Sequence, residues 1–216
     1  MLDTAIWTSQ RLTGATLILG CVLFVTGAGI YSLMRDQQGT LIFGLPPRAW
    51  ALLVFAHPRI WRWATLLFIA GALVTLFGLA QLTMLLRAAS DPAFASLALL
   101  ASAIGAVLWL IHLAARLVVD PWVGGMLAKG DALPEFYEPL GLWLRVLFVL
   151  YTILTFGGLV LFGGAVIASS LLPHWLGWTS IVFGLGGLGL LATTRDAPPF
   201  LHHLLPLVMG IVLLLL

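Results

Sequence analysis

Long stretches without charge limit what this chain can fold into. No Asp, Glu, Lys or Arg lies between Arg145 and Arg195, or between Arg11 and Arg35. A helix needs about 20 mostly apolar residues to cross roughly 30 Å of hydrocarbon, and each stretch is at least that long. Charged residues make up 8% of the chain, against about 25% in soluble domains. The sequence therefore predicts an integral membrane protein, because only lipid would solvate such a surface.

The charged residues divide the chain into six predicted crossings. The stretch from Arg145 to Arg195 is too long for one helix at about 1.5 Å per residue. Ser169 and Pro173 supply a break in it, because serine caps helices and proline favours the first helical turn. The predicted fold is all-α, a polytopic transmembrane helix bundle of one domain over residues 1–216, with spans near 12–34, 62–86, 92–119, 141–168, 173–194 and 198–216.

Two connections are longer than a simple turn. Residues 36–61 contain three prolines around the apolar piece 49–56, which is too short to span and is expected to lie in the interface or re-enter as a half-helix. Residues 120–140 hold Gly124, Gly125 and several acidic residues, and are expected to form a solvated loop. These boundaries place no Asp, Glu or Lys inside any predicted span.

The basic residues predict the orientation. Eight of the ten lie in the first, third and fifth connections or beside them. The positive-inside rule then places the long loops in the cytoplasm and both termini outside. These arginines flank spans rather than form a basic patch, so no nucleic-acid partner is expected. Cys21 is the only cysteine, so no intramolecular disulfide can form.

Glycines recur seven residues apart in several spans. A seven-residue repeat stays on one helix face, and small residues let helices in lipid approach closely. In the third span the same spacing runs through Ala98, Gly105 and His112, which predicts that His112 faces protein rather than lipid. The glycine pairs are Gly20/Gly27, Gly71/Gly78, Gly157/Gly164 and Gly177/Gly184.

Four ionisable side chains fall within or near the ends of spans, where such groups suggest function. His112 and Arg116 lie in the third span, and His202 and His203 lie in the sixth. His112 is about 6 Å inward of Arg116, and His202 is about 9 Å inward of Asp196 at 1.5 Å per residue. The imidazoles can therefore meet at one level. Adjacent helical residues point about 100° apart, so only one of His202 and His203 is expected to share the pocket of His112.

Two facing imidazoles would suit one haem b or a chlorin pigment near the cytoplasmic leaflet. The candidate cofactor-binding set is His112, His202, His203, Arg116 and Trp109, whose indole could stack on the cofactor. The competing interpretation has His112 hydrogen-bonded to a neighbouring helix and the other two histidines at the headgroup level. No metal is specified, and no catalytic residue is predicted, because H-E-x-x-H, G-x-S-x-G and P-loop motifs do not occur.

The segment Leu172-Pro173-His174-Trp175-Leu176-Gly177-Trp178 resembles a turn in uncharacterised bacterial multi-spanning membrane proteins. In those proteins a Leu-Pro-x-Trp-Leu-Gly-Trp turn opens a late helix. The resemblance extends over about the last third of the chain and implies a bacterial inner-membrane protein. It implies no activity.

Three functions remain open from the sequence. The leading hypothesis is a non-catalytic subunit or scaffold of a larger membrane complex, in contact with lipid and other subunits. The first alternative is a cofactor-bearing electron-transport subunit that uses His112 with His203 or His202. The second is a permease for a small neutral solute, whose pathway would involve Gln81 and the segment from Pro46 to Pro58.

Overall fold

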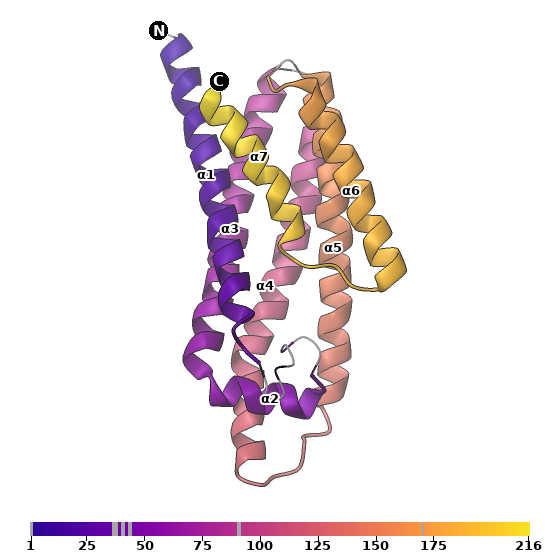
Figure 1. Cartoon of the computed structure of the whole chain (residues 1–216). Coiled ribbons are helices and arrows are strands. Elements are labelled where there is room, and N and C mark those ends of the chain that lie inside the picture. Colours follow the sequence, from indigo (N-terminus) through magenta and orange to yellow (C-terminus); the bar gives the residue numbers. More distant parts are fainter. Residues whose placement is uncertain (1, 36–38, 40–41, 43–44, 90–91, 170) are drawn as a thin grey trace.

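The computed structural model describes residues 2–35, 39, 42, 45–89, 92–169 and 171–216. Within this part the chain forms a bundle of α-helices (Figure 1). The helices are α1 (Leu2–Tyr31), α2 (Pro47–Ala56), α3 (Pro58–Ala89), α4 (Pro92–Ala128), α5 (Tyr137–Ala168), α6 (His174–Thr194) and α7 (Leu201–Leu215).

Five of these helices, α1, α3, α4, α5 and α6, are long and apolar enough to cross a membrane. The all-α, membrane-type bundle predicted from the sequence is therefore confirmed. The sixth predicted span, 198–216, forms the 15-residue α7, which is about 22 Å long and shorter than the hydrocarbon thickness. It is shorter because the helix begins only at Leu201, after Pro198 and Pro199.

The prediction of a solvated loop over 120–140 is wrong in its first half. Helix α4 continues through Pro121 to Ala128. Asp120, predicted to lie outside the spans, is inside this helix and only 1% exposed. Packing overrides the break expected from the glycines, because the last turns of α4 bury Val123 and Leu127 against Ala51 of α2 and Tyr137 of α5.

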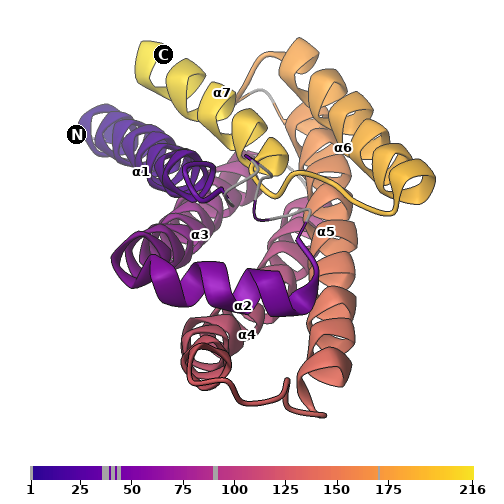
Figure 2. The same ribbon diagram turned by 60° about the horizontal axis from the view of Figure 1, so that its bottom comes forward.

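Helix α2 lies across one end of the bundle (Figure 2). It buries Ala51, Leu53 and Val54 and packs mainly on α4. Gly124 allows this close approach, because a Cβ there would lie 2.2 Å from the carbonyl oxygen of Ala51. The apolar piece 49–56 therefore forms a short helix across the bundle end (Figure 2). Of the first connection, residues 36–38, 40–41 and 43–44 lie outside the described part.

Close packing at glycines holds α1 to α3 and α5 to α6. A Cβ at Gly20 would lie 2.4 Å from Oγ1 of Thr75, and one at Gly71 would lie 2.6 Å from the amide nitrogen of Phe24. The glycine stripes of α1, α3 and α6 are thus confirmed as packing positions. The stripe predicted for α5 is wrong at Gly157, which has open space beside it, whereas a Cβ at Gly164 would lie 3.4 Å from the ring of Phe94 on α4. The contact of α5 with Gly177 is made by Gly163.

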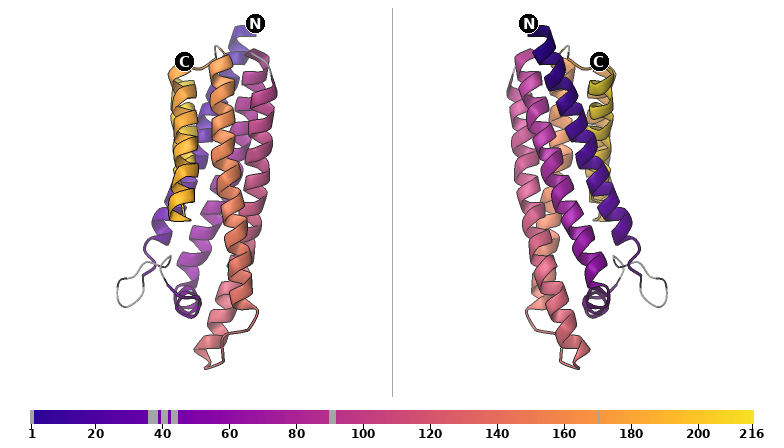
Figure 3. Two further views of the ribbon diagram at one scale, coloured as in Figure 1. Left: turned by 90° about the vertical axis from the view of Figure 1, so that its right-hand side faces the viewer. Right: turned by 90° about the vertical axis from the view of Figure 1, so that its left-hand side faces the viewer.

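Both termini lie at the same end of the bundle, opposite α2 and the connection between α4 and α5 (Figures 1 and 3). The six residues between α6 and α7 return the chain toward the termini, so that α7 packs along α1. Gly14 and Gly210 meet where these two helices cross, with each potential Cβ within 2.7 Å of the other residue's carbonyl oxygen. The crossing places the first turns of α7 inside the bundle.

Candidate functional site

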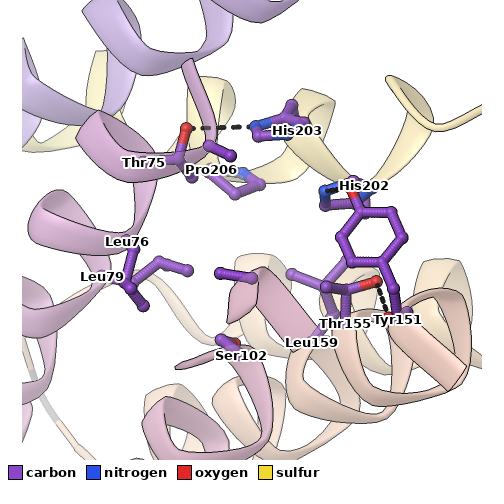
Figure 4. Close-up of a pocket in the computed structure, with 12 residues that line it drawn as sticks. Thr75, Leu76, Leu79, Ser102, Tyr151, Thr155, Leu159, His202, His203 and Pro206 are labelled. Carbon is purple, nitrogen blue, oxygen red and sulfur yellow. Dashed lines mark hydrogen bonds between the residues drawn. The ribbon is translucent and has the colours of Figure 1, made fainter. Parts of the chain in front are cut away.

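The predicted histidines of α4 and α7 lie in one cluster of aromatic and hydroxyl side chains inside the bundle. Figure 4 shows the part of this cluster around His202 and His203. His202 and His203 are 9% and 2% exposed, and their ring centroids are 4.2 Å apart. Helices α1, α3, α4 and α5 supply the surrounding residues. A chain of ring contacts runs from His112 through Trp109 and Tyr151 to His202. The helical rise assumed from Asp196 to His202 does not apply, because α7 begins only at Leu201.

His203 is held by α3 and α1. Its Nδ1 lies 3.1 Å from Oγ1 of Thr75, and its ring centroid lies 3.9 Å from that of Phe24. Other buried threonines, such as Thr65 and Thr83, donate to the carbonyl four residues earlier in their own helix. Thr75 instead uses its hydroxyl between helices. Nε2 of His203 is buried and has no hydrogen-bond partner.

His202 is held by α5 through Tyr151. Nε2 of His202 lies 2.8 Å from the tyrosine hydroxyl, and both side chains are buried. Phe156 contacts the same imidazole edge-on, with 6.2 Å between ring centroids. Sequence reasoning missed Tyr151, although a tyrosine within an apolar span is a usable signal because its buried hydroxyl needs a partner.

His112 lies farther along the same cluster. Its Nδ1 donates to the carbonyl oxygen of Leu144 at 2.9 Å, since a carbonyl can only accept. The indole of Trp109 stacks on its imidazole, with 5.1 Å between ring centroids. Trp109 also stacks on Tyr151 at 4.9 Å. His112 therefore contacts α5, as the heptad spacing predicts.

Both adjacent histidines of α7 are buried inside the bundle, and they meet different helices, as the angle of about 100° between adjacent helical residues predicts. The physical reason is that α7 contacts α1, α3 and α5 together. More than one of its faces is then covered by protein. His202 meets Tyr151 on α5 while His203 meets Thr75 on α3.

A half-open pocket of about 30 Å³ lies within the cluster, which is the space of one or two water molecules. The two histidines line it together with Thr75, Ser102 and Tyr151. The rings of Trp109 and Tyr151 stand between His112 and His202. These imidazoles therefore do not face each other across a space for a macrocycle. Among the described residues no group of three His, Cys, Asp or Glu could hold a metal ion.

Arg116 belongs to a different polar cluster, one helical turn beyond His112. Asp120 accepts hydrogen bonds from Nε1 of Trp50 at 2.7 Å, from the hydroxyl of Tyr137 at 3.0 Å and from Nη1 of Arg116 at 3.3 Å. The guanidinium also lies 4.8 Å from the ring centroid of Trp50. We call these four residues the Asp120 cluster. It ties α2 and α5 to α4.

The two features assigned to a permease lie far apart. Gln81 follows Pro58 by 23 residues in the same helix, which is about 35 Å. The segment from Pro46 to Pro58 forms α2 at the end of the bundle where α3 begins. The side-chain oxygen of Gln81 is buried without a hydrogen-bond partner. Nothing in the described cavity connects it to α2.

Replacing Thr75 by valine should destabilise the fold more than the same change at Thr65. The valine removes the hydrogen bond to His203 and leaves an imidazole with no partner, at a cost of about 1–2 kcal/mol in the free energy of unfolding. At Thr65 the lost hydrogen bond lies within one helix, and about 0.5 kcal/mol is expected there. Unfolding in mixed detergent micelles measures both. Equal losses would contradict a stabilising role for the contact between Thr75 and His203.

Comparison of the chain with known protein families, curated proteins and solved structures found no match in any of the three.

Proposed function

We propose that this protein is a non-catalytic subunit or scaffold of a larger membrane complex, and that α6 carries its docking face. The observation behind this proposal is the outer surface of α6. Gly186 and Gly189 lie there with no heavy atom within 4 Å of a potential Cβ. Val182, one turn earlier, is 69% exposed. Helices in lipid associate through small residues of this kind, because their backbones can approach closely.

The way α6 is packed supports this assignment. It lies along α5 and makes only slight contact with α7 (Figure 1). Its other glycines, Gly177, Gly184 and Gly187, are buried against α5. The helix therefore has two glycine faces, one already used inside the bundle and one open. A second helix could pack on the open face as α5 packs on the other.

The interior is consistent with a structural role. His112 and His202 each contact α5, and His203 contacts α3, through hydrogen bonds at 3.1 Å or less. Interhelical hydrogen bonds of this type help to hold transmembrane helices together. The imidazoles then act as tertiary contacts between α4, α5, α7 and α3, and no substrate is required to explain their burial.

We place the complex in a bacterial inner membrane, with the long loops in the cytoplasm and both termini outside. The resemblance of the Leu172–Trp178 segment and the distribution of basic residues support this placement. In this arrangement α7, with the residues that follow α6, makes the sixth crossing. Its histidines are covered by protein, as intramembrane polar groups require.

Substitution of both open glycines by leucine should remove the protein from its complex. We expect the wild-type chain, extracted in mild detergent, to migrate well above its monomer mass in a native gel. The variant G186L/G189L should migrate as a monomer, because the leucines keep a partner backbone from approaching. Monomer folding should persist, since leucine favours helix more than glycine does.

Gly29 offers the matched control for this experiment. It also has open space beside it, but it lies on α1. The variant G29L should assemble as the wild type does. A monomeric wild-type protein would overturn the proposed function. So would a Soret band in the purified protein that His112→Ala abolishes, because that result would establish the haem alternative.

A further inference from the structure

If α6 crosses the membrane, Arg145 within α5 and Arg195 after α6 mark the same membrane surface. Helix α6 has 21 residues and spans about 30 Å, the thickness of the hydrocarbon. Arg195 follows its last residue. On α5, the distance from Arg145 to Ala168 is about 35 Å. Trp143, next to this level, is 48% exposed, as aromatic residues at an interface commonly are.

A groove runs between α5 and α6 at this level. The two helices diverge toward the C-terminal end of α6 (Figure 1), and the space between them has a volume of about 770 Å³. Its walls are apolar, with Val149 and Ile153 from α5 and Leu188 and Leu191 from α6. Arg145 and Arg195 line the same groove. The groove therefore combines an aliphatic channel with two guanidinium groups.

These two arginines have no ion-pair partner among the residues that the structure describes. Both are exposed. The nearest acidic residue in sequence, Asp196, uses Oδ1 to accept a hydrogen bond from the amide of Ala197. Two unpaired positive charges at the membrane surface attract an anion, and arginine binds phosphate through pairs of N–H groups.

We propose that this groove binds one anionic phospholipid. The phosphate lies between Arg145 and Arg195, and an acyl chain follows Val149, Ile153 and Leu188 into the bilayer. Basic pockets between transmembrane helices on the cytoplasmic side recognise anionic headgroups in this way. The site is distinct from the open glycine face of α6, so lipid binding and assembly through Gly186 and Gly189 can be tested separately.

The test uses the purified, delipidated full-length protein in mild detergent. We expect phosphatidylglycerol to raise the melting temperature, and phosphatidylcholine to have a much smaller effect. Free inorganic phosphate should have no effect, because it lacks the chain that fills the groove. The double variant R145Q/R195Q should unfold as the wild type does without lipid and should bind phosphatidylglycerol at least tenfold more weakly.

Arg62 provides the control, because it is exposed on α3 at the same end of the bundle. R62Q should bind phosphatidylglycerol as tightly as the wild type. If R62Q and R145Q/R195Q lost affinity for phosphatidylglycerol equally, the binding would come from general charge attraction. That result would overturn the proposed lipid site. Equal stabilisation by both lipids would overturn it too, as would protection by phosphate alone.

A photoreactive phosphatidylglycerol gives a second readout that does not depend on variant folding. In nanodiscs, its acyl-chain label should attach mainly to the peptides that carry Ile153 and Leu188. Labelling spread evenly over all helices would contradict a specific site. A protein cross-link from a photoreactive residue at position 153, in place of the lipid adduct, would show that a partner helix fills the groove.

Discussion

Asp120→Ala is expected to lower the free energy of unfolding by about 3 kcal/mol, the largest effect of any single polar substitution in the bundle. The alanine removes the acceptor for Trp50, Tyr137 and Arg116 at once. Two of these donors are then left buried or half-buried without partners, while the partly exposed guanidinium of Arg116 can turn toward water. Equilibrium unfolding in mixed micelles measures the loss.

Two further variants test whether the lost hydrogen bonds of Asp120 cause the loss of stability. Asp120→Asn keeps one acceptor oxygen but turns an N–H₂ group toward a donor, so about half of the loss is expected. Asp131→Ala is the control, because Asp131 is exposed in the loop that follows α4. It should change stability by less than about 0.5 kcal/mol. If Asp120→Ala were no more destabilising than Asp131→Ala, the Asp120 cluster would not hold α2 and α5 to α4.

A single methyl group at Gly20 should destabilise the bundle by about 2 kcal/mol. In Gly20→Ala the new Cβ would lie 2.4 Å from Oγ1 of Thr75 and 2.6 Å from its amide nitrogen. The backbone of α3 must therefore move away from α1. That displacement also disturbs the hydrogen bond between Thr75 and His203. A thermal or detergent-induced unfolding curve should show the change directly.

Gly157→Ala is the matched control, and it should raise the free energy of unfolding where Gly20→Ala lowers it. Gly157 also lies in the middle of a long helix, but no heavy atom would approach its Cβ within 4 Å. Alanine favours helix over glycine by about 1 kcal/mol, so this variant should be more stable than the wild type. Equal destabilisation by both substitutions would mean that glycine flexibility, rather than close packing at Gly20, is what matters.

The long helices could be predicted from the sequence because their signal is local. An uncharged stretch such as 146–194 can be solvated only by lipid, and its length fixes the number of crossings within narrow limits. The position of His112 one turn before Arg116 follows from the rise per residue in the same way. For His202 the same argument fails, because residues 195–200 precede α7 and are not helical. Glycine spacing predicted packing faces on α1 and α3, and the structure shows that Gly20 and Gly71 pack these two helices against each other.

The end of α4 could not be predicted in this way. Gly124, Pro121 and Asp120 all indicate a loop by local criteria. The helix continues because Gly124 accommodates the backbone of Ala51, and because Trp50 and Tyr137 satisfy the carboxylate. These partners lie 70 and 17 residues away in the sequence, so only the folded chain shows that they meet.

The amino-acid sequence by itself determined that the chain is an apolar helical bundle and where most of its long helices lie. Hydropathy and helical rise depend only on residues near one another in the chain. The tertiary structure decided which side chain each histidine meets, that both His202 and His203 are buried, and that Asp120 joins three helices. These outcomes depend on how α7 and α2 cross the other helices, and crossing positions are set by the fit of side chains that are distant in sequence.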